Sequence, residues 1–164
     1  MASVAREASV SKALVHYYFS TRQELLRAAF AYSAEQWEVA VATDLERAPD
    51  ARQRVERFLL ASVAPTEPFE GHRALWNEVW SSLRVDEELR PVVHDAYERW
   101  VRQLVQLVQQ AKRDGGAAAI DARATAWRLA AVVDGLDSML YLRLVDRTRA
   151  RRLVRQSIEK ELGS

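Results

Sequence analysis

Apolar residues recur along the chain at intervals of three and four residues, which is the spacing of one face of an α-helix. The clearest stripe comprises Leu26, Phe30, Ser33, Trp37 and Val41, with Ser33 as its weakest member. No segment shows the strict alternation that is typical of a half-buried strand. The pattern therefore predicts an all-α fold, with helices over about residues 2–8, 11–18, 21–47, 51–64, 71–83, 86–113, 121–144 and 147–162.

Polar residues stand where several of these helices should begin. Ser11 is a good N-cap for the second helix, and Asp86 for the sixth. Ser20 or Thr21 can cap the long third helix, with Glu24 near its third position, as in a capping box. These caps support the boundaries that the apolar spacing predicts.

The composition agrees with this interpretation and excludes several classes of protein. The chain has 164 residues, of which 49% are hydrophobic and 29% charged, and this suits one domain or two small ones. Only 5 Gly and 4 Pro leave too few turn signals for a β-sandwich or a β-barrel. The absence of cysteine excludes disulfide scaffolds, thiolate zinc sites and cysteine nucleophiles.

Charge and hydropathy bear on partners and location. The net charge of +1 gives no global argument for nucleic acid, so that argument needs a local motif. No apolar run approaches the roughly 18 residues of a membrane span. Arg6, Glu7 and Lys12 interrupt the first twenty residues, unlike the apolar core of a signal peptide. We therefore expect a cytoplasmic protein with no membrane partner.

Motifs for catalysis or metal binding are missing from the sequence. The three histidines, His16, His72 and His94, belong to no His-Glu-x-x-His or Glu-x-x-His pattern. His94 and Glu98 share a helix face, but two ligands do not make a metal site. No Gly-x-Ser-x-Gly motif is present either. We expect no enzyme, no metal and no cofactor.

The segment from Ala5 to Phe19 has the punctuation of a helix-turn-helix. Two short helices meet at a tight turn centred on Ser9 and Val10, and the second would enter the major groove of DNA. Phe19 is expected in the core, whereas tyrosine hydroxyls and basic groups suit phosphate oxygens. The candidate DNA contacts are Ser11, Lys12, Ala13, His16, Tyr17, Tyr18 and Arg22.

The same segment resembles the TetR family of transcriptional repressors. The matching residues are Ala5, Ala8, Val10, Ser11, Val15, Tyr18, Phe19, Arg22, Glu24, Leu25 and Leu26. Ser9 and Ala13 depart from the family pattern, which usually has glycine at both positions. The resemblance implies a helix-turn-helix DNA-binding domain over residues 1–30 and a ligand-binding and dimerisation domain over residues 31–164.

In the resembled family the helix-turn-helix is part of a three-helix unit. We therefore expect a further helix of about 12–15 residues, roughly 20 Å long, before residue 2. That helix would cover Val4, Ala8, Leu14, Val15 and Phe19. Without it, the DNA-binding domain in this sequence is expected to be incomplete at its N-terminus.

Two further segments are similar to the choline-responsive, BetI-type branch of these repressors, namely HRALWNEVW from residue 72 and AAVVDGL from residue 130. Aromatic residues gather in this part of the chain, where they either pack as large core residues or line a cavity. An aromatic box suits an organic cation, which Asp137 could neutralise, whereas Asp134 suggests a helix-packing or dimer contact. The candidate effector-binding residues are Phe58, Trp76, Trp80, Tyr97, Trp100 and Asp137.

In the resembled family the last two helices form a four-helix bundle with a second subunit. The predicted helix over 121–144 is apolar on most sides and needs cover on two faces, which agrees with a homodimer. The expected dimer contacts are Trp127, Val133, Leu136, Leu140, Leu153, Val154 and Ile158. We expect a repressor that binds a palindromic double-stranded DNA operator and is released by a small-molecule effector. The alternatives are a dimeric small-molecule-binding protein without DNA-binding activity and an α-helical enzyme.

Overall fold

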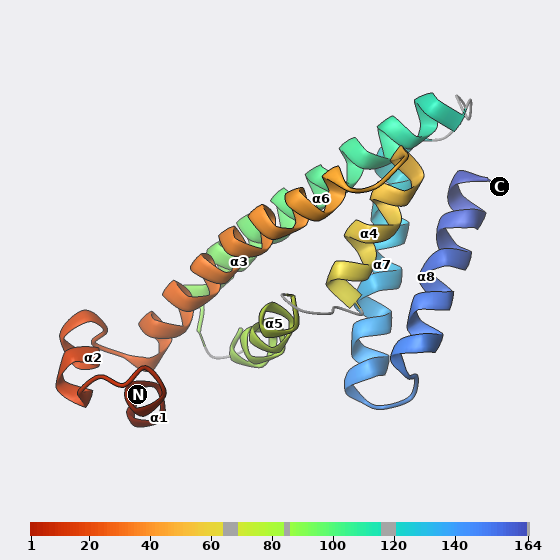
Figure 1. The fold of residues 1–164 in the computed structure, drawn as a ribbon. Helices are drawn as coiled ribbons and strands as arrows, with labels where there is room; N and C mark the ends of the chain where they lie inside the picture. Colours follow the sequence, from red (N-terminus) through yellow and green to blue (C-terminus); the bar gives the residue numbers. More distant parts are fainter. Residues whose placement is uncertain (64–68, 84–85, 116–120, 164) are drawn as a thin grey trace.

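Eight α-helices make up the part of the chain that this computed structural model describes, which is residues 1–63, 69–83, 86–115 and 121–163 (Figure 1). They are α1 (Ala2–Glu7), α2 (Lys12–Tyr18), α3 (Arg22–Glu46), α4 (Ala51–Val63), α5 (Glu70–Ser82), α6 (Leu89–Gly115), α7 (Ala122–Tyr141) and α8 (Arg147–Leu162). No strand occurs among the described residues. The all-α prediction is confirmed and each expected helix is present, although residue 64, the end of the predicted fourth helix, lies outside the described residues.

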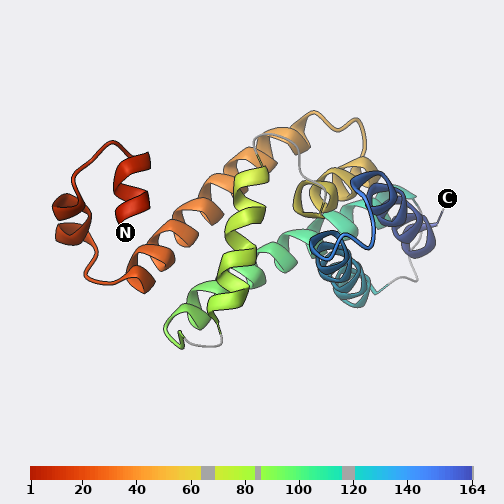
Figure 2. The same cartoon turned by 90° about the horizontal axis from the view of Figure 1, so that it is seen from below.

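The helices are arranged around α3, which connects the two ends of the molecule. The short helices α1 and α2 lie at its N-terminal end, and α4, α7 and α8 lie toward its C-terminal end (Figure 1). Helices α4, α6, α7 and α8 pack on one another, while α5 packs chiefly on α3 and crosses between the two ends (Figure 2). The expected domain boundary at residue 30 falls inside α3, which continues from the helix-turn-helix into the helical body.

Helix α3 buries one stripe of apolar side chains along its whole length. The buried residues are Leu26, Phe30, Ala34, Trp37, Val41 and Leu45. Ser33, the weakest member of the predicted stripe, lies next to it, and Ala34 takes the core position. The Ser33 hydroxyl is 2.9 Å from Nδ1 of His72 on α5, so this residue joins two helices by a hydrogen bond instead.

The buried apolar side chains of the described residues form two clusters. The smaller one joins the first half of α3 to α5 and α6, and the larger one joins the second half of α3 to α4, α6, α7 and α8. Phe30 is fully buried in the smaller cluster, and Phe58 and Leu104 are fully buried in the larger one. Full burial of one such side chain stabilises a fold by about 1.5–3 kcal/mol, so both clusters hold the helices in place.

Helix α7 ends at Tyr141 rather than at residue 144, where the apolar pattern places its end. Arg143 adopts a left-handed conformation with φ of 57°. Its N–H donates to the carbonyl of Leu140 at 3.1 Å, and the N–H of Leu144 donates to the carbonyl of Met139 at 2.9 Å. These two bonds form a Schellman motif, which closes a helix. The prediction was wrong here because apolar residues continue beyond the motif, and Leu144 is 67% exposed.

The same motif closes α1 and forms the turn of the helix-turn-helix. Ser9 has a φ of 54°. Its N–H donates to the carbonyl of Arg6 at 3.1 Å, and the N–H of Val10 donates to the carbonyl of Ala5 at 2.9 Å. A residue with a Cβ loses about 1–2 kcal/mol in this conformation, whereas glycine does not. Glycine is therefore the better residue at position 9.

Replacing Ser9 by glycine should stabilise this turn by about 1 kcal/mol. The expected observation is roughly fivefold slower hydrogen exchange at the Val10 amide, whose hydrogen bond closes the motif. Ser3→Gly is the matched control, because the same change inside α1 should weaken the helix by up to about 1 kcal/mol. Faster exchange at Val10 in Ser9→Gly would contradict the strained turn.

Candidate functional site

Helices α1 and α2 pack against each other through a small apolar contact and leave one face of α2 in solvent. Ala5 and Val15 are buried, at 4% and 7% exposure. Lys12, Ala13 and His16 are exposed, as is Tyr17, at 81%. Most of the predicted DNA contacts therefore share the accessible surface of one helix, where no described part of the chain covers them.

Two further predicted contacts, Ser11 and Tyr18, lie at the ends of α2. The Ser11 hydroxyl caps the helix by accepting from the N–H of Leu14 at 3.0 Å, as the sequence predicts. Tyr18 is 65% exposed, and its ring meets the ring of Tyr17 edge-on, with 5.1 Å between centroids. Phe19, by contrast, is only partly exposed. The exposed end of α2 thus presents two tyrosine hydroxyls.

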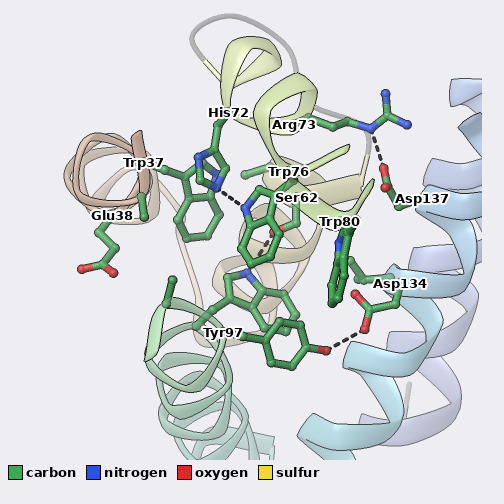
Figure 3. Close-up of a pocket in the computed structure, with 15 residues that line it drawn as sticks. Trp37, Glu38, Ser62, His72, Arg73, Trp76, Trp80, Tyr97, Asp134 and Asp137 are labelled. Atoms are coloured by element: carbon green, nitrogen blue, oxygen red, sulfur yellow. Dashed lines mark hydrogen bonds and ion pairs between the residues drawn. The ribbon is translucent and has the colours of Figure 1, made fainter. Parts of the chain in front are cut away.

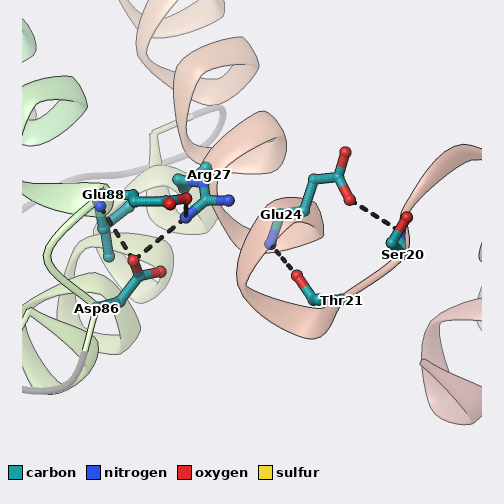
Figure 4. A network of polar contacts seen from close by, with 7 residues as sticks. Ser20, Thr21, Glu24, Arg27, Asp86 and Glu88 are labelled. Carbon is teal, nitrogen blue, oxygen red and sulfur yellow. Dashed lines mark hydrogen bonds and ion pairs between the residues drawn. The ribbon is translucent and has the colours of Figure 1, made fainter.

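A variant of the predicted capping box is present at the start of α3, in which Glu24 reaches back to the residue before the N-cap (Figure 4). Thr21 is the N-cap, and its hydroxyl accepts from the N–H of Glu24 at 3.0 Å. The Glu24 carboxylate in turn accepts from the N–H of Ser20 at 2.8 Å. Arg22, the seventh predicted DNA contact, forms an ion pair with Glu78 of α5. The first turn of α3 is therefore tied both to its own cap and to α5.

Other polar clusters among the described residues pair acids with arginines. Arg27 of α3 lies between Asp86 and Glu88, at 3.2 Å and 2.6 Å, and Asp86 also caps α6 by accepting from the N–H of Leu89 (Figure 4).

No group of three or more His, Asp or Glu in the described part of the chain could hold a metal ion. Within the same ranges, none of the helices has the length and apolar character to cross a membrane.

A cavity of about 90 Å³ lies between α3, α4, α5, α6 and α7 (Figure 3). Both apolar clusters contribute to its wall. The side chains with aromatic rings or polar groups that line it are Trp37, Glu38, Ser62, His72, Arg73, Trp76, Trp80, Tyr97, Trp100, Asp134 and Asp137. Five of the six predicted effector-binding residues are thus brought together, namely Trp76, Trp80, Tyr97, Trp100 and Asp137.

The aromatic rings of the cavity are in contact with one another. The ring centroids of Trp76 and Trp80 are 5.9 Å apart, those of Trp76 and Tyr97 are 6.5 Å apart, and those of Tyr97 and Trp100 are 5.8 Å apart. Phe58, one of the six residues expected to bind the effector, does not line the cavity. It is fully buried behind the wall, where it stacks on Trp100 at 5.3 Å. Phe58 therefore supports the cavity from the core.

Three carboxylates stand in the same wall, and each has a different partner. Asp137 accepts from Nε of Arg73 at 2.6 Å. Glu38 accepts from Nε of Arg99 at 2.8 Å, and Asp134 accepts from the hydroxyl of Tyr97 at 2.6 Å.

Desolvation changes the titration of the last pair. It raises the pKa of Asp134, against the Tyr97 hydrogen bond that lowers it, and the nearby Asp137 charge raises it further. Burial likewise raises the pKa of Tyr97, and the contact with Asp134 adds to that effect. The Tyr97 hydroxyl therefore stays protonated and donates a hydrogen bond to Asp134.

Two family models match the chain, one over the helix-turn-helix and one over the helices that surround the cavity. Residues 1–29 match the model for bacterial regulatory proteins of the TetR family, and residues 51–163 match the C-terminal domain of BetI-type transcriptional repressors. The second match alone covers more than half of the chain. The chain belongs to the TetR family. Both matched regions agree with the resemblances seen in the sequence, the helix-turn-helix at the N-terminus and the BetI-type segments that surround the cavity.

Solved structures of TetR-family proteins share this fold. A protein described as a TetR-family transcriptional regulator from Rhodococcus sp. is 26% identical, with a TM-score of 0.82, and the match covers 98% of this chain and 86% of that one. A protein described as a transcriptional regulator from Saccharomonospora viridis, in complex with choline, is 23% identical, with a TM-score of 0.81 over 95% of this chain and 82% of that one. Among curated protein sequences, none matches the chain significantly.

The side chains predicted to form the TetR-type dimer contact lie on both sides of α7 and α8. Val133, Leu136, Val154 and Ile158 are buried in the chain's own core, at 5%, 4%, 1% and 2% exposure. Leu140 and Leu153 are partly buried against that core. Trp127 is 48% exposed, and Met139 and Tyr141 are also exposed on α7. The sequence pattern identifies the apolar helices correctly but does not separate their inner faces from their outer ones.

Trp37, His72 and Asp134 are among the cavity residues that the sequence prediction misses. Trp37 belongs to the α3 stripe and contributes its ring to the wall from the core side, so its spacing alone suggests packing. Asp134 lies on the same helix as Asp137, one turn earlier. His72 sits between the rings of Trp37 and Trp76, at 5.7 Å and 6.0 Å between centroids. A single histidine carries no motif, and only its neighbours in space indicate its role.

His72 is held neutral inside the aromatic wall. Its Nε2 accepts from the indole N–H of Trp76 at 2.6 Å, and its Nδ1 is 2.9 Å from the Ser33 hydroxyl. Burial lowers its pKa from 6.5 to about 4, although a hydrogen bond with the Ser33 backbone acts in the opposite direction. A neutral ring with an unprotonated Nε2 is the state that can accept from Trp76. The histidine thereby links α3 to the cavity wall on α5.

The depressed pKa of His72 should make the fold sensitive to acid. Between pH 6.5 and about 4 the unfolded chain binds a proton at His72 and the folded chain does not, so stability should fall as pH falls through this range. The loss at pH 4 should reach about 3 kcal/mol at most. Urea unfolding at several pH values should show a smaller loss in His72→Gln, which cannot titrate. Parallel profiles for both proteins would contradict this origin.

Proposed function

We propose that this TetR-family protein is a ligand-responsive repressor that binds a palindromic operator as a homodimer and is released by a small cationic effector. The observation that carries the proposal is the course of α3. This single helix of 25 residues follows α2 directly in the chain and contributes Ala34, Trp37 and Glu38 to the cavity wall. At about 1.5 Å per residue it is roughly 37 Å long, so one rigid element reaches both sites.

In this proposal residues 1–30 act on DNA. The N-terminal half of α2 enters the major groove, where Lys12, Ala13 and His16 meet base edges or phosphates. Tyr17 and Tyr18 donate hydrogen bonds from their hydroxyls to phosphate oxygens, which fixes the orientation of the helix without reading sequence. Arg22 contacts a phosphate once it is free of Glu78. The exposure of these side chains in the unbound protein supports the assignment.

Residues 31–164 bind the effector and a second subunit. Five aromatic rings line the cavity together with three carboxylates and one arginine, and ring faces and negative charge both attract an organic cation. The choline bound to the Saccharomonospora viridis protein of similar fold supports this class of ligand. For the dimer, the exposed Trp127 and the partly buried Leu140 and Leu153 offer apolar surface on the last two helices.

Helix α5 is the second route between the two sites. His72, Arg73, Trp76 and Trp80 face the cavity, while Glu78 of the same helix holds Arg22 at the start of α3. An effector that binds better to one position of α5 than to another will shift the protein toward that position. The shift changes how α3, and with it α2, is held. In a dimer this alters the distance between two recognition helices that must fit grooves about 34–36 Å apart.

The test uses DNA selected from a random pool by binding to the intact protein. Fluorescence anisotropy should show two subunits bound to a palindromic sequence, and choline should weaken that binding at least about tenfold. Failure to select any DNA, with choline still bound, would favour the small-molecule-binding protein without DNA-binding activity. An operator affinity that does not change with any cation that binds in the cavity would overturn the regulatory proposal.

A further inference from the structure

We propose that Asp134, rather than Asp137, is the carboxylate that neutralises the positive charge of the effector. The assignment depends on the proposed function of the cavity as a cation site. It names the residue that distinguishes a charged ligand from a neutral ligand of the same shape.

The charges already present in the wall separate the three carboxylates. Asp137 and Glu38 each have an arginine partner, Arg73 and Arg99 respectively. Asp134 has no cationic side chain among the described residues within ion-pair distance, and it accepts only from the neutral hydroxyl of Tyr97. Its negative charge is therefore the one that no fixed positive charge balances.

The position of Asp134 also suits a ligand in the aromatic box. Figure 3 shows its carboxylate turned toward the Tyr97 hydroxyl, beside the lining rings of Trp80 and Tyr97. Asp137 instead faces Arg73 of α5. The bond from Tyr97 fixes one oxygen of Asp134 and leaves the other free for a cation. An ammonium group that touches the rings therefore comes close to Asp134.

Desolvation gives independent support. Asp134 is exposed as a residue, but neighbouring side chains partly desolvate its carboxylate, and this desolvation raises its pKa. A bound cation would restore part of the favourable surroundings that the carboxylate loses in this way. A quaternary ammonium group fits best, because it donates no hydrogen bonds and its methyl groups can pack on indole and phenol faces.

The experiment compares two probes of nearly equal shape, choline and its neutral analogue 3,3-dimethyl-1-butanol, in which carbon replaces the ammonium nitrogen. Isothermal titration calorimetry with the intact protein should give a preference for choline of about tenfold to 100-fold. In Asp134→Asn this preference should fall to about threefold or less, because choline binds more weakly while the alcohol does not. Asparagine keeps an oxygen that can accept from Tyr97, so the wall should stay in place.

Asp137→Asn is the matched control, since it removes one carboxylate of the same type from the same helix. It should keep most of the preference for choline. Loss of the preference in Asp137→Asn, or its retention in Asp134→Asn, would overturn the assignment while leaving the cation site intact. If the wild-type protein binds neither probe, the cation-binding function itself fails, and the assignment fails with it. Circular dichroism and urea unfolding establish that both variants are folded.

Discussion

Replacing Phe58 by alanine should lower the free energy of unfolding by about 3–5 kcal/mol. The side chain is fully buried, and its ring lies 5.3 Å from that of Trp100 and 5.4 Å from that of Trp37. Truncation leaves a hole between α3, α4 and α6, and it removes the support of two rings that line the effector cavity. Choline affinity should therefore fall as well, although Phe58 touches no ligand.

Urea unfolding followed by circular dichroism measures the first effect. Tyr32→Ala is the matched control, because Tyr32 is an aromatic residue on α3 that is 65% exposed, and its loss should cost at most about 0.5 kcal/mol. A cost below about 1 kcal/mol for Phe58→Ala would show that the larger apolar cluster is not packed around this ring.

Replacing both Lys12 and Tyr17 by alanine should weaken operator binding about 100-fold, since each side chain is expected to make a contact with the duplex. Both residues are exposed in the unbound protein, so the free energy of unfolding should change by less than about 0.5 kcal/mol. The loss of a lysine contact to phosphate should also reduce the dependence of log Kd on log salt by about 1.

Fluorescence anisotropy at several salt concentrations measures both quantities. Tyr32→Ala again provides the control, because it removes an exposed tyrosine from α3 and should leave operator affinity unchanged. An unchanged affinity and salt dependence in the double variant would show that the exposed face of α2 does not meet DNA.

The order and extent of the helices follow from the sequence because apolar spacing and polar caps act locally. The capping box at Thr21 and Glu24 is one example, and the N-cap at Ser11 is another. Local patterns do not show where a helix ends when apolar residues continue at helical spacing beyond its last turn. Helix α7 ends before the left-handed Arg143, and an arginine is not a recognisable stop signal for a helix. The predicted helix over 121–144 is therefore three residues too long at its C-terminal end.

The site is predictable only in part, because it depends on which helix faces which. The spacing of Trp76 and Trp80 places two rings on one face, and both line the cavity. Phe58 has the same chemistry but points into the core. The arginine partner of Asp137 comes from a separate helix, so the sequence cannot show that the charge of Asp134 is the one left unbalanced.

In the proposed mechanism, an effector in the cavity weakens the binding of the operator by α2, and the operator weakens the binding of the effector. Linkage requires that a ligand which weakens operator binding is itself bound more weakly by the operator complex, by the same factor. The direct measurement is the Kd of choline for the free protein and for the protein saturated with operator, by calorimetry in the same buffer. We expect a Kd at least about tenfold higher in the operator complex. Equal values in the two states would contradict it.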